Sequence, residues 1–383
     1  MFSLPSSPPI KLVKVEALVF RAPIAEPVRT SFGIMVDRPA VLVRIEDSDG
    51  VIGWGEIWCN FPGVGAEHRA RVLESCIAPI LLEKEWQDPL EAFVVLESRM
   101  RILAIQSGEP GTLAQAIAGA DIALWDLIGK RLGQPLWRLL GGSNRIQTYA
   151  SGLNPISPEI LAAAKLAEGY RAFKLKVGFG TKRDIGNLRT LRDLLGAATP
   201  LMVDANQAWT YDEAVEMSRQ LSEFELLWLE EPIPADSPLQ AWQSLAKLSP
   251  IPLAGGENLR GDEAFATAIS SGAFAVIQPD IGKWGGFSGC LPVAKRAIEH
   301  GRMFCPHWLG GGIGLVASMH LKAASGGEGY VEVDSNQNPL RDLLATPAPR
   351  LDNGVITLSE RPGLGVEPNF DAVKEFRRPH QYA

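Results

Sequence analysis

Short apolar runs recur through the second half of the chain, and each ends in a polar or charged side chain. By subtraction, successive end residues lie 28, 26, 27, 23, 27 and 25 positions apart: Lys176, Asp204, Glu230, Glu257, Asp280, His307 and Glu332. One strand, one helix and two turns need about this length, so the period predicts a (β/α) barrel with its active site at the carboxyl ends of the strands. We expect eight strands, near residues 146–152, 172–177, 201–206, 226–232, 252–258, 276–281, 303–308 and 329–334.

The first part of the chain has a different pattern. Residues 11–58 are strand-like on both sides of an Asp49-Gly50 pair, which is a hairpin signal. From there to Gly142 the apolar spacing becomes helical, with Thr112 as the expected N-cap of one helix. Gly141-Gly142 marks a domain boundary, because the strand–helix alternation begins directly afterwards. The tail NGVITLSERPGLGVEPN is again strand and turn, and we expect it to return to the first domain. The predicted units are 1–142, 143–350 and 351–383.

Composition excludes several classes of protein. With 383 residues, 46% of them apolar and 21% charged, the chain is long enough for a barrel and a second domain with a large core. A net charge of −7 and the lack of a basic tract argue against a nucleic-acid partner. No signal-peptide pattern and no run of 18 apolar residues occur, so no membrane partner is expected. The four cysteines have no C-x-x-C spacing, which argues against a zinc site or a disulfide framework and fits a cytoplasmic protein.

Side chains of a strand alternate between its two faces, which predicts where the polar groups of the barrel point. Lys174 and Lys176 share the inner face of one strand. Glu230, rather than its neighbour Glu231, faces inward, because Leu229 is expected to face the helices. The same reasoning turns other polar residues of the strands inward, namely Asp204, Asn206, Glu332 and, as a further candidate, Asp334.

Three of these carboxylates come from consecutive strands: Asp204, Glu230 and Glu257. They would concentrate negative charge in a small volume, which only a cation makes tolerable. A set of oxygen ligands without cysteine or histidine favours a hard divalent ion. We expect Mg²⁺, and Mn²⁺ stays open as an alternative.

The strand-end motifs resemble those of one superfamily. The Lys-x-Lys strand, VDAN, LEEP, AGGEN, QPDxxKxGG and PHW are similar to the enolase superfamily, specifically its mandelate racemase subgroup. The segments IALWDLIGKRLGQPLWRLLGG and PGLGV extend the resemblance over nearly the whole chain. It implies a (β/α)₇β barrel beneath an α+β capping domain, assembled as a homodimer or octamer. It also implies site roles: Asp204, Glu230 and Glu257 as metal ligands, Lys176 as a base, Asp280 with His307 as a dyad, and Glu332 as a carboxylic acid that hydrogen-bonds the substrate carboxylate.

The implied chemistry is removal of a proton α to a carboxylate, which leaves an enediolate. Mg²⁺, Lys174 and a protonated Glu332 could hold the charge of that anion. Lys176 must be neutral to act as a base, and both Lys174 and the cation lower its pKa from about 10.4. His307 titrates near pH ~6.5 without such help, and Asp280 would fix its tautomer.

Several reactions share this first step. The leading reading is dehydration of an acid sugar. The run KLKVGFG and the segment VEVDSNQNPLR also resemble galactarolactone cycloisomerases. Racemisation or epimerisation of a hydroxy acid or a proline derivative is the third possibility. A non-catalytic binding protein would have lost ligands that this chain retains.

Substrate contacts are expected from two loops of the capping domain, at 28–36 and 57–65. The candidates there are Thr30, Ser31, Phe32 and Trp58, and the barrel adds Asn206, Lys283 and Trp308. Lys283 aligns with a lysine base of the muconate-cycloisomerase-like branch, so direct catalysis by it stays open. The glycine-rich stretch 310–312 either shapes the pocket or leads into the next helix.

Overall fold

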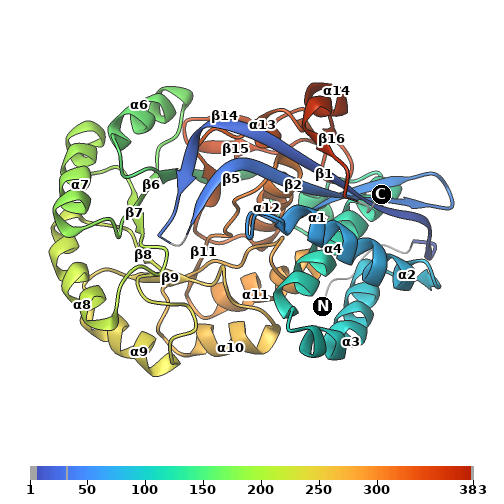
Figure 1. Ribbon diagram of the computed structural model, residues 1–383, viewed down its shortest axis with the longest axis horizontal. Helices are drawn as coiled ribbons and strands as arrows, with labels where there is room; N and C mark the ends of the chain where they lie inside the picture. The colour runs from blue at the N-terminus through green and yellow to red at the C-terminus, as the bar shows by residue number, and fades with distance from the viewer. Residues whose placement is uncertain (1–6, 32, 381–383) are drawn as a thin grey trace.

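A computed structural model describes residues 7–31 and 33–380 of the chain (Figure 1). Its N-terminal part is an antiparallel sheet in the order β17-β1-β2-β3, with β4 paired to β1. The expected hairpin turn joins β2 to β3: the Gly50 N–H donates to the Asp47 carbonyl at 3.0 Å, and the Asp47 carboxylate accepts two further backbone N–H groups. The strands are β1 (Ile10–Arg29), β2 (Ile34–Asp47), β3 (Ile52–Ile57), β4 (Glu85–Trp86) and β17 (Arg377–Arg378).

Helices cover one face of this sheet, and the longest of them begins earlier than expected. It starts at Pro110 with Glu109 as N-cap, so the prediction of Thr112 as N-cap is wrong. Proline lacks the N–H that a cap would satisfy and its φ is already helical, which favours the earlier start. The helices of this part are α1 (Gly65–Val72), the π-helical turn η1 (Leu73–Ile77), α2 (Ala78–Leu81), α3 (Pro89–Ser107), α4 (Pro110–Arg131) and α5 (Leu136–Leu139).

The second part is the expected barrel. In the described residues, seven parallel strands follow one another in space from β5 to β11, and an eighth, β12, pairs in parallel with β5. The strands are β5 (Arg145–Leu153), β6 (Phe173–Lys176), β7 (Leu201–Asp204), β8 (Leu229–Glu230), β9 (Leu253–Gly255), β10 (Val276–Ile277), β11 (Met303–Phe304) and β12 (Val331–Asp334). Several are shorter than predicted, because polar residues such as Asp280 and His307 lie just beyond the ladder, where they form an isolated bridge.

Helices surround the barrel on the outside, as Figure 1 shows for α6 to α10. They are α6 (Pro158–Glu168), α7 (Thr181–Leu195), α8 (Tyr211–Gln220), η2 (Leu221–Phe224), α9 (Leu239–Leu248), α10 (Asp262–Ser270), α11 (Gly286–Glu299), α12 (Gly312–Ser325) and α13 (Pro339–Asp342). No helix in the described ranges combines the length and hydropathy needed to cross a bilayer.

Two apolar clusters confirm the predicted alternation of faces. Phe173, Leu175 and Val203 belong to the large cluster that the strands share with the helices. The barrel interior holds a separate cluster at the opposite end from the polar groups. Its buried members are Tyr149, Ala172, Met202, Trp228, Ala254, Val276 and Cys305.

The C-terminal tail contacts both parts of the molecule. The hairpin of β14 (Arg350–Asp352) and β15 (Val355–Thr357) pairs with barrel strand β5, a contact in addition to the expected return of the tail to the first domain. Strand β16 (Glu367–Pro368) pairs with β13 (Ala345–Thr346), and α14 (Phe370–Val373) and η3 (Lys374–Phe376) follow. The chain then reaches the first sheet, where β17 pairs with β1. The domain limits at 142 and 350 stay predictions.

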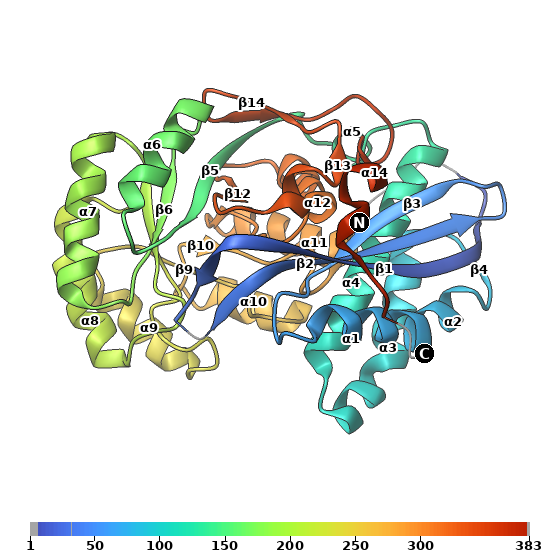
Figure 2. The same ribbon diagram turned by 45° about the horizontal axis from the view of Figure 1, so that its top comes forward.

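The long β1–β2 hairpin extends from the first sheet over the barrel, as Figure 2 shows. Its tip carries Thr30 and Ser31, and the Ser31 hydroxyl donates a hydrogen bond to the backbone carbonyl of Asn206 in the barrel. The N-terminal part therefore caps the carboxyl ends of the barrel strands.

Candidate active site

A cavity of about 220 Å³ lies between the capping domain and the carboxyl ends of the barrel strands. Thr30, Trp58 and Phe61 line it from the capping side. The barrel contributes Ser151, Gly152, Lys176, Asp204, Asn206, Gln207, Glu257, Asn258, Lys283, His307, Leu309, Glu332 and Asp334. Strand-end residues that are far apart in the sequence therefore meet around one small volume.

Lys174 is buried and does not line the cavity, but it contacts Glu332, which does. Its Nζ is 2.6 Å from Glu230 Oε1 and 2.9 Å from Glu332 Oε1. Burial alone would lower the pKa of Lys174, but the two carboxylates outweigh it and hold that pKa well above its usual value. Lys174 is thus a fixed positive charge.

Lys176 has the opposite character. Its Nζ has one hydrogen bond in the described structure, to the Arg29 carbonyl at 3.4 Å. Burial lowers the pKa of Lys176, and the charges of Lys174 and Arg38 act in the same direction against Asp204 and Asp334. The expected direction is correct, although burial contributes more to it than Lys174 does. A neutral amine, which a base requires, is thereby favoured.

Asp280 and His307 form the expected pair. His307 Nδ1 is 2.6 Å from Asp280 Oδ2, and the other oxygen of Asp280 accepts the backbone N–H groups of Gly282 and Lys283. His307 Nε2 lies 2.6 Å from Glu257 Oε2. Burial would lower the pKa of His307, but Glu257 first, then Glu332 and Asp280, hold that pKa well above its usual value.

Glu332 differs from the expectation of a protonated acid. Burial would raise its pKa, but Lys174 first, then His307 and the Ser151 hydroxyl, hold that pKa below its usual value. Ser151 donates to Glu332 Oε1, and the Trp308 N–H donates to Oε2 at 3.1 Å. The carboxyl group is ionised in these surroundings.

The three carboxylates expected to bind metal end adjacent strands, and Asp204 pairs in register with Glu230. Burial and neighbouring acids raise the pKa of Asp204, and they raise that of Glu230 to about 7. Trp228 and Gln278 donate to Glu230 Oε2 at 3.1 and 2.7 Å. These buried oxygens with mutually repelling charges fit a hard divalent cation.

As they stand, these carboxylates do not converge on one point. In residues 7–31 and 33–380, no three acidic, histidine or cysteine side chains form a group that could hold a metal ion. Glu230 is turned toward Lys174, and Glu257 is turned toward His307 and toward Lys283 Nζ at 3.3 Å. Binding would require Glu257 to leave His307 Nε2, so the ligand roles stay predictions.

Most expected substrate contacts lie at the cavity, and the exceptions are Ser31, Phe32 and Trp308. Thr30, Trp58, Asn206 and Lys283 line it, and Lys283 Nζ lies 4.7 Å from the centre of the Trp58 ring. Trp308 is only 1% exposed and does not line the cavity. Phe32 lies outside the described residues.

Two polar pairs at this site join residues that are far apart in the sequence, Glu231 with Asn258 and Arg38 with Asp334. The buried Glu231 accepts two hydrogen bonds from Asn258 Nδ2, at 3.0 and 2.9 Å, and Asn258 lines the cavity. Arg38 reaches from the capping domain and pairs with Asp334 in a buried contact. Both belong to pairs that only the folded chain brings together.

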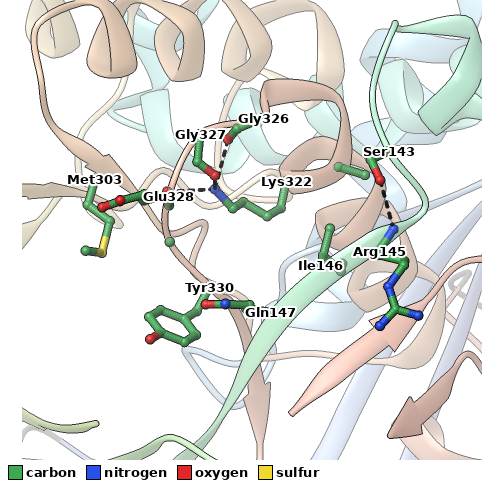
Figure 3. A pocket seen from close by; sticks show the side chains of 12 residues that line it. Ser143, Arg145, Ile146, Gln147, Met303, Lys322, Gly326, Gly327, Glu328 and Tyr330 are labelled. Atoms are coloured by element: carbon green, nitrogen blue, oxygen red, sulfur yellow. Dashed lines mark hydrogen bonds between the residues drawn. The ribbon is translucent and has the colours of Figure 1, made fainter. Parts of the chain in front are cut away.

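A second cavity, of about 510 Å³, lies at the other end of the barrel, near the first residues of β5 and β11 (Figure 3). Its buried cation, Lys322, donates to the backbone carbonyls of Gly326, Gly327 and Glu328 at 3.0, 3.2 and 2.8 Å. The ammonium group is therefore saturated by the chain itself. The strand-end polar groups lie at the first cavity.

Comparisons with known proteins agree with this architecture. The model of the mandelate racemase / muconate lactonizing enzyme N-terminal domain matches residues 14–141, and the enolase C-terminal domain-like model matches residues 159–372. A D-galactarolactone cycloisomerase from Agrobacterium fabrum is 35% identical over 370 residues, which cover 91% of this chain and 94% of that protein.

Solved structures are similar over the whole fold. A mandelate racemase/muconate lactonizing enzyme from Bordetella bronchiseptica RB50 has a TM-score of 0.90 and 54% identity, covering 96% of this chain and 99% of that one. A racemase from Streptomyces coelicolor A3(2) with bound magnesium has a TM-score of 0.87 and 30% identity, covering 96% and 100%. The curated relatives include lyases and isomerases, namely dehydratases, cycloisomerases and a racemase. The chain is therefore a lyase or isomerase that belongs to the mandelate racemase/muconate lactonizing enzyme family of the enolase superfamily.

Proposed function

We propose that this enzyme removes the proton α to the carboxylate of an acid sugar and then eliminates the C3 hydroxyl as water. The observation that carries the proposal is the pairing of two proton-transfer groups around one cavity: Lys176 with a lowered pKa, and His307 held by Asp280. They come from β6 and from the end of β11, which are not neighbours in the barrel. A substrate between them can lose a proton to one group and receive a proton from the other.

Each proton has a defined place in this scheme. Lys176 Nζ or His307 Nε2 takes the C2 proton, depending on the configuration of the substrate. His307, as an imidazolium, gives its Nε2 proton to the departing C3 oxygen, so that water leaves and an enol remains. Asp280 accepts the Nδ1–H, which fixes the tautomer and stabilises the imidazolium. Tautomerisation of the enol gives a keto-deoxy acid.

Lys174 balances the charge that develops on the substrate carboxylate after C2 loses its proton. Its pKa stays high, so it supplies a positive charge at every working pH. Asp204, Glu230 and Glu257 are the residues that would hold Mg²⁺, an ion named with one of the similar structures. When bound, Mg²⁺ supplies a Lewis acid for the carboxylate oxygens.

A lactone cycloisomerase is the second candidate, because the curated relative at 35% identity is a galactarolactone cycloisomerase. In that reaction the leaving group is a ring carboxylate, which departs without the proton that hydroxide needs. Dehydration therefore needs His307 as an acid for the leaving group, whereas cycloisomerisation does not. Both use the same first proton transfer.

The test is ¹H NMR in D₂O with Mg²⁺ across aldonic acids, aldaric acids and sugar-acid lactones. Loss of the α-proton signal reports the first step for any substrate. A product that reacts with semicarbazide and is lighter than the substrate by one water marks dehydration. A semicarbazide-reactive product of unchanged mass marks cycloisomerisation, and an unreactive isomer of unchanged mass marks epimerisation. Absence of exchange and turnover across all three classes would refute the proposal.

A further inference from the structure

The two dyad residues lie a few residues before the starts of two helices. Asp280 precedes α11, which begins at Gly286, and His307 precedes α12, which begins at Gly312. Both helices have a glycine as N-cap, Gly285 and Gly311, and neither has a side-chain cap of its own. The N–H groups of a first helical turn have no partner within the helix and must find one elsewhere.

Carboxylates of the capping domain supply these partners. Glu56, at the end of β3, accepts the N–H of Gly311 and the N–H of Gly314, the latter at 2.8 Å. Asp121, on α4, accepts the N–H of Ser288 at 3.0 Å. Both carboxylates are 1% exposed. Each of the two helices therefore begins on a buried acid from the other domain.

The glycines at these helix starts make the close approach possible. At Gly286, where φ is +52°, an added Cβ would lie 2.2 Å from Asp121 Oδ2. At Gly311 an added Cβ would lie 2.6 Å from Glu56 Oε1. Neither carboxylate could reach its N–H groups past a larger residue. The glycine-rich stretch 310–312 is thus a contact with the capping domain that leads into the next helix.

Short, hydrogen-bonded segments connect these contacts to the dyad. From His307 to Gly311 is four residues by subtraction, and the segment is fixed by Trp308, whose indole donates to the Gly311 carbonyl at 3.0 Å. From Asp280 to Gly286 is six, and there the Asp280 carboxylate accepts the N–H groups of Gly282 and Lys283 at 2.8 and 3.0 Å. A shift of either helix start should therefore reach a dyad residue.

We propose that Glu56 and Asp121 are positioning residues for the Asp280–His307 dyad, acting through the starts of α12 and α11. The inference rests on the proposed function, because it assigns these acids to the His307 side of that reaction. Lys176 lies on β6, which neither acid contacts through a hydrogen bond. Loss of either acid should therefore affect proton transfer by His307 and spare proton transfer by Lys176.

The variants are Glu56→Gln and Asp121→Asn, which keep the shape and replace one acceptor oxygen of the carboxyl group by a donor NH₂ group. Asp126→Asn is the matched control. Asp126 is also a buried carboxylate of α4 that accepts two backbone N–H groups, from Trp54 at 2.8 Å and Leu364 at 2.7 Å, but it has no contact with the dyad segments. It reproduces the change of a buried carboxyl group to an amide without the connection to His307.

The first readout needs no substrate. In the magnesium-loaded protein, the downfield ¹H signal of the His307 ring N–H is assigned by its loss in His307→Asn. We expect this signal to shift or broaden in Glu56→Gln and Asp121→Asn and to stay in place in Asp126→Asn. An unchanged signal in both test variants would overturn the inference.

The second readout compares two rates of α-proton exchange in D₂O, one that depends on His307 and one that depends on Lys176. The substrate is the acid whose α-proton the wild-type enzyme exchanges. Misplacement of a catalytic group by about 1 Å can reduce its rate about 100-fold, so we expect the His307-dependent rate to fall at least about tenfold. Exchange by Lys176 should stay within about twofold of wild type. Equal losses on both faces, matched by Asp126→Asn, would mean general destabilisation and would overturn the inference.

Failure of the proposed function would look different. Wild-type enzyme would then exchange no acid on either face, and the ring N–H signal alone would decide the positioning role. If Glu56→Gln does not fold, Glu56→Asp replaces it, because a side chain shorter by one methylene keeps the carboxyl group and withdraws it from the helix start. The inference would be contradicted if Glu56→Asp kept the wild-type ratio of the His307-dependent to the Lys176-dependent exchange rate and the His307 ring N–H signal did not shift.

Discussion

Glu56 should make the stability of this protein fall as the pH rises through the weakly acidic range. Two opposing effects act on its carboxyl group. Burial and the nearby charge of Asp280 favour the protonated form, whereas the N–H groups of Gly311 and Gly314 favour the carboxylate. Burial is the larger effect, and it raises the pKa of Glu56 to about 7 from 4.5.

The size and sign of the effect follow from this difference. One pKa unit corresponds to about 1.4 kcal/mol, so a rise of roughly 2.5 units corresponds to about 3 kcal/mol. Between pH 4.5 and 7 the folded state keeps a proton that the unfolded state has released. Raising the pH through this window favours unfolding. The stabilisation by the bound proton of Glu56 is fully present only below pH 4.5, the pKa of the group in the unfolded chain.

Urea unfolding of wild type and of Glu56→Gln at a series of pH values measures this contribution. The other titrating groups, including Glu230, are common to both proteins and cancel in the difference. The free energy of unfolding of wild type minus that of the variant should fall by about 3 kcal/mol between pH 4.5 and 7. A difference that stays flat, or that rises with pH, would refute the reasoning and would mean that the helix start outweighs burial.

Further predictions concern the catalytic groups. His307→Asn should abolish net turnover but retain α-proton exchange at the Lys176 face, and Lys176→Met should lose that exchange; both are measured by ¹H NMR in D₂O. Removal of divalent metal with EDTA should abolish exchange on both faces, and Mg²⁺ should restore it. Lys174→Met leaves the buried carboxylates of Glu230 and Glu332 without their cation, so it should lower the free energy of unfolding of the metal-free protein by roughly 3 kcal/mol in urea titrations. A loss below about 0.5 kcal/mol would contradict that pairing.

The barrel could be predicted because its signal is both local and periodic. Alternation within a strand puts Lys174 and Lys176 on one face, and the parallel arrangement brings the strand ends together. These two rules locate Asp280 and His307 near each other although neither belongs to a ladder. The sequence could not predict where each strand stops, since that depends on which polar side chain finds a better partner outside the ladder.

Charge states were less predictable than positions. The ionised Glu332 depends on the distance of 2.9 Å to Lys174 and on a hydroxyl from β5, neither of which has a signature in the sequence. Likewise, burial affects the pKa of Lys176 more than its charged neighbour does. A pattern of residue types shows which groups meet but gives neither their separation nor their access to water.

Glu56 and Asp121 were missed because each acts on a segment more than 160 residues away. A partial signal was nevertheless present at the helix starts. Four barrel helices, α7, α10, α11 and α12, follow a glycine N-cap without a side-chain cap. The first two carry an acid in their own first turn, Asp184 in α7 and both Asp262 and Glu263 in α10, whereas α11 and α12 carry none.

An acid near a helix start offsets the positive end of the helix dipole. A helix that begins with glycine and lacks its own acid, but whose start is buried, must therefore obtain one from another element. In this chain that reasoning distinguishes the two helices that follow the dyad from the two that do not. It also means that the capping domain does more than close the cavity, because two of its carboxylates replace caps that the barrel helices lack.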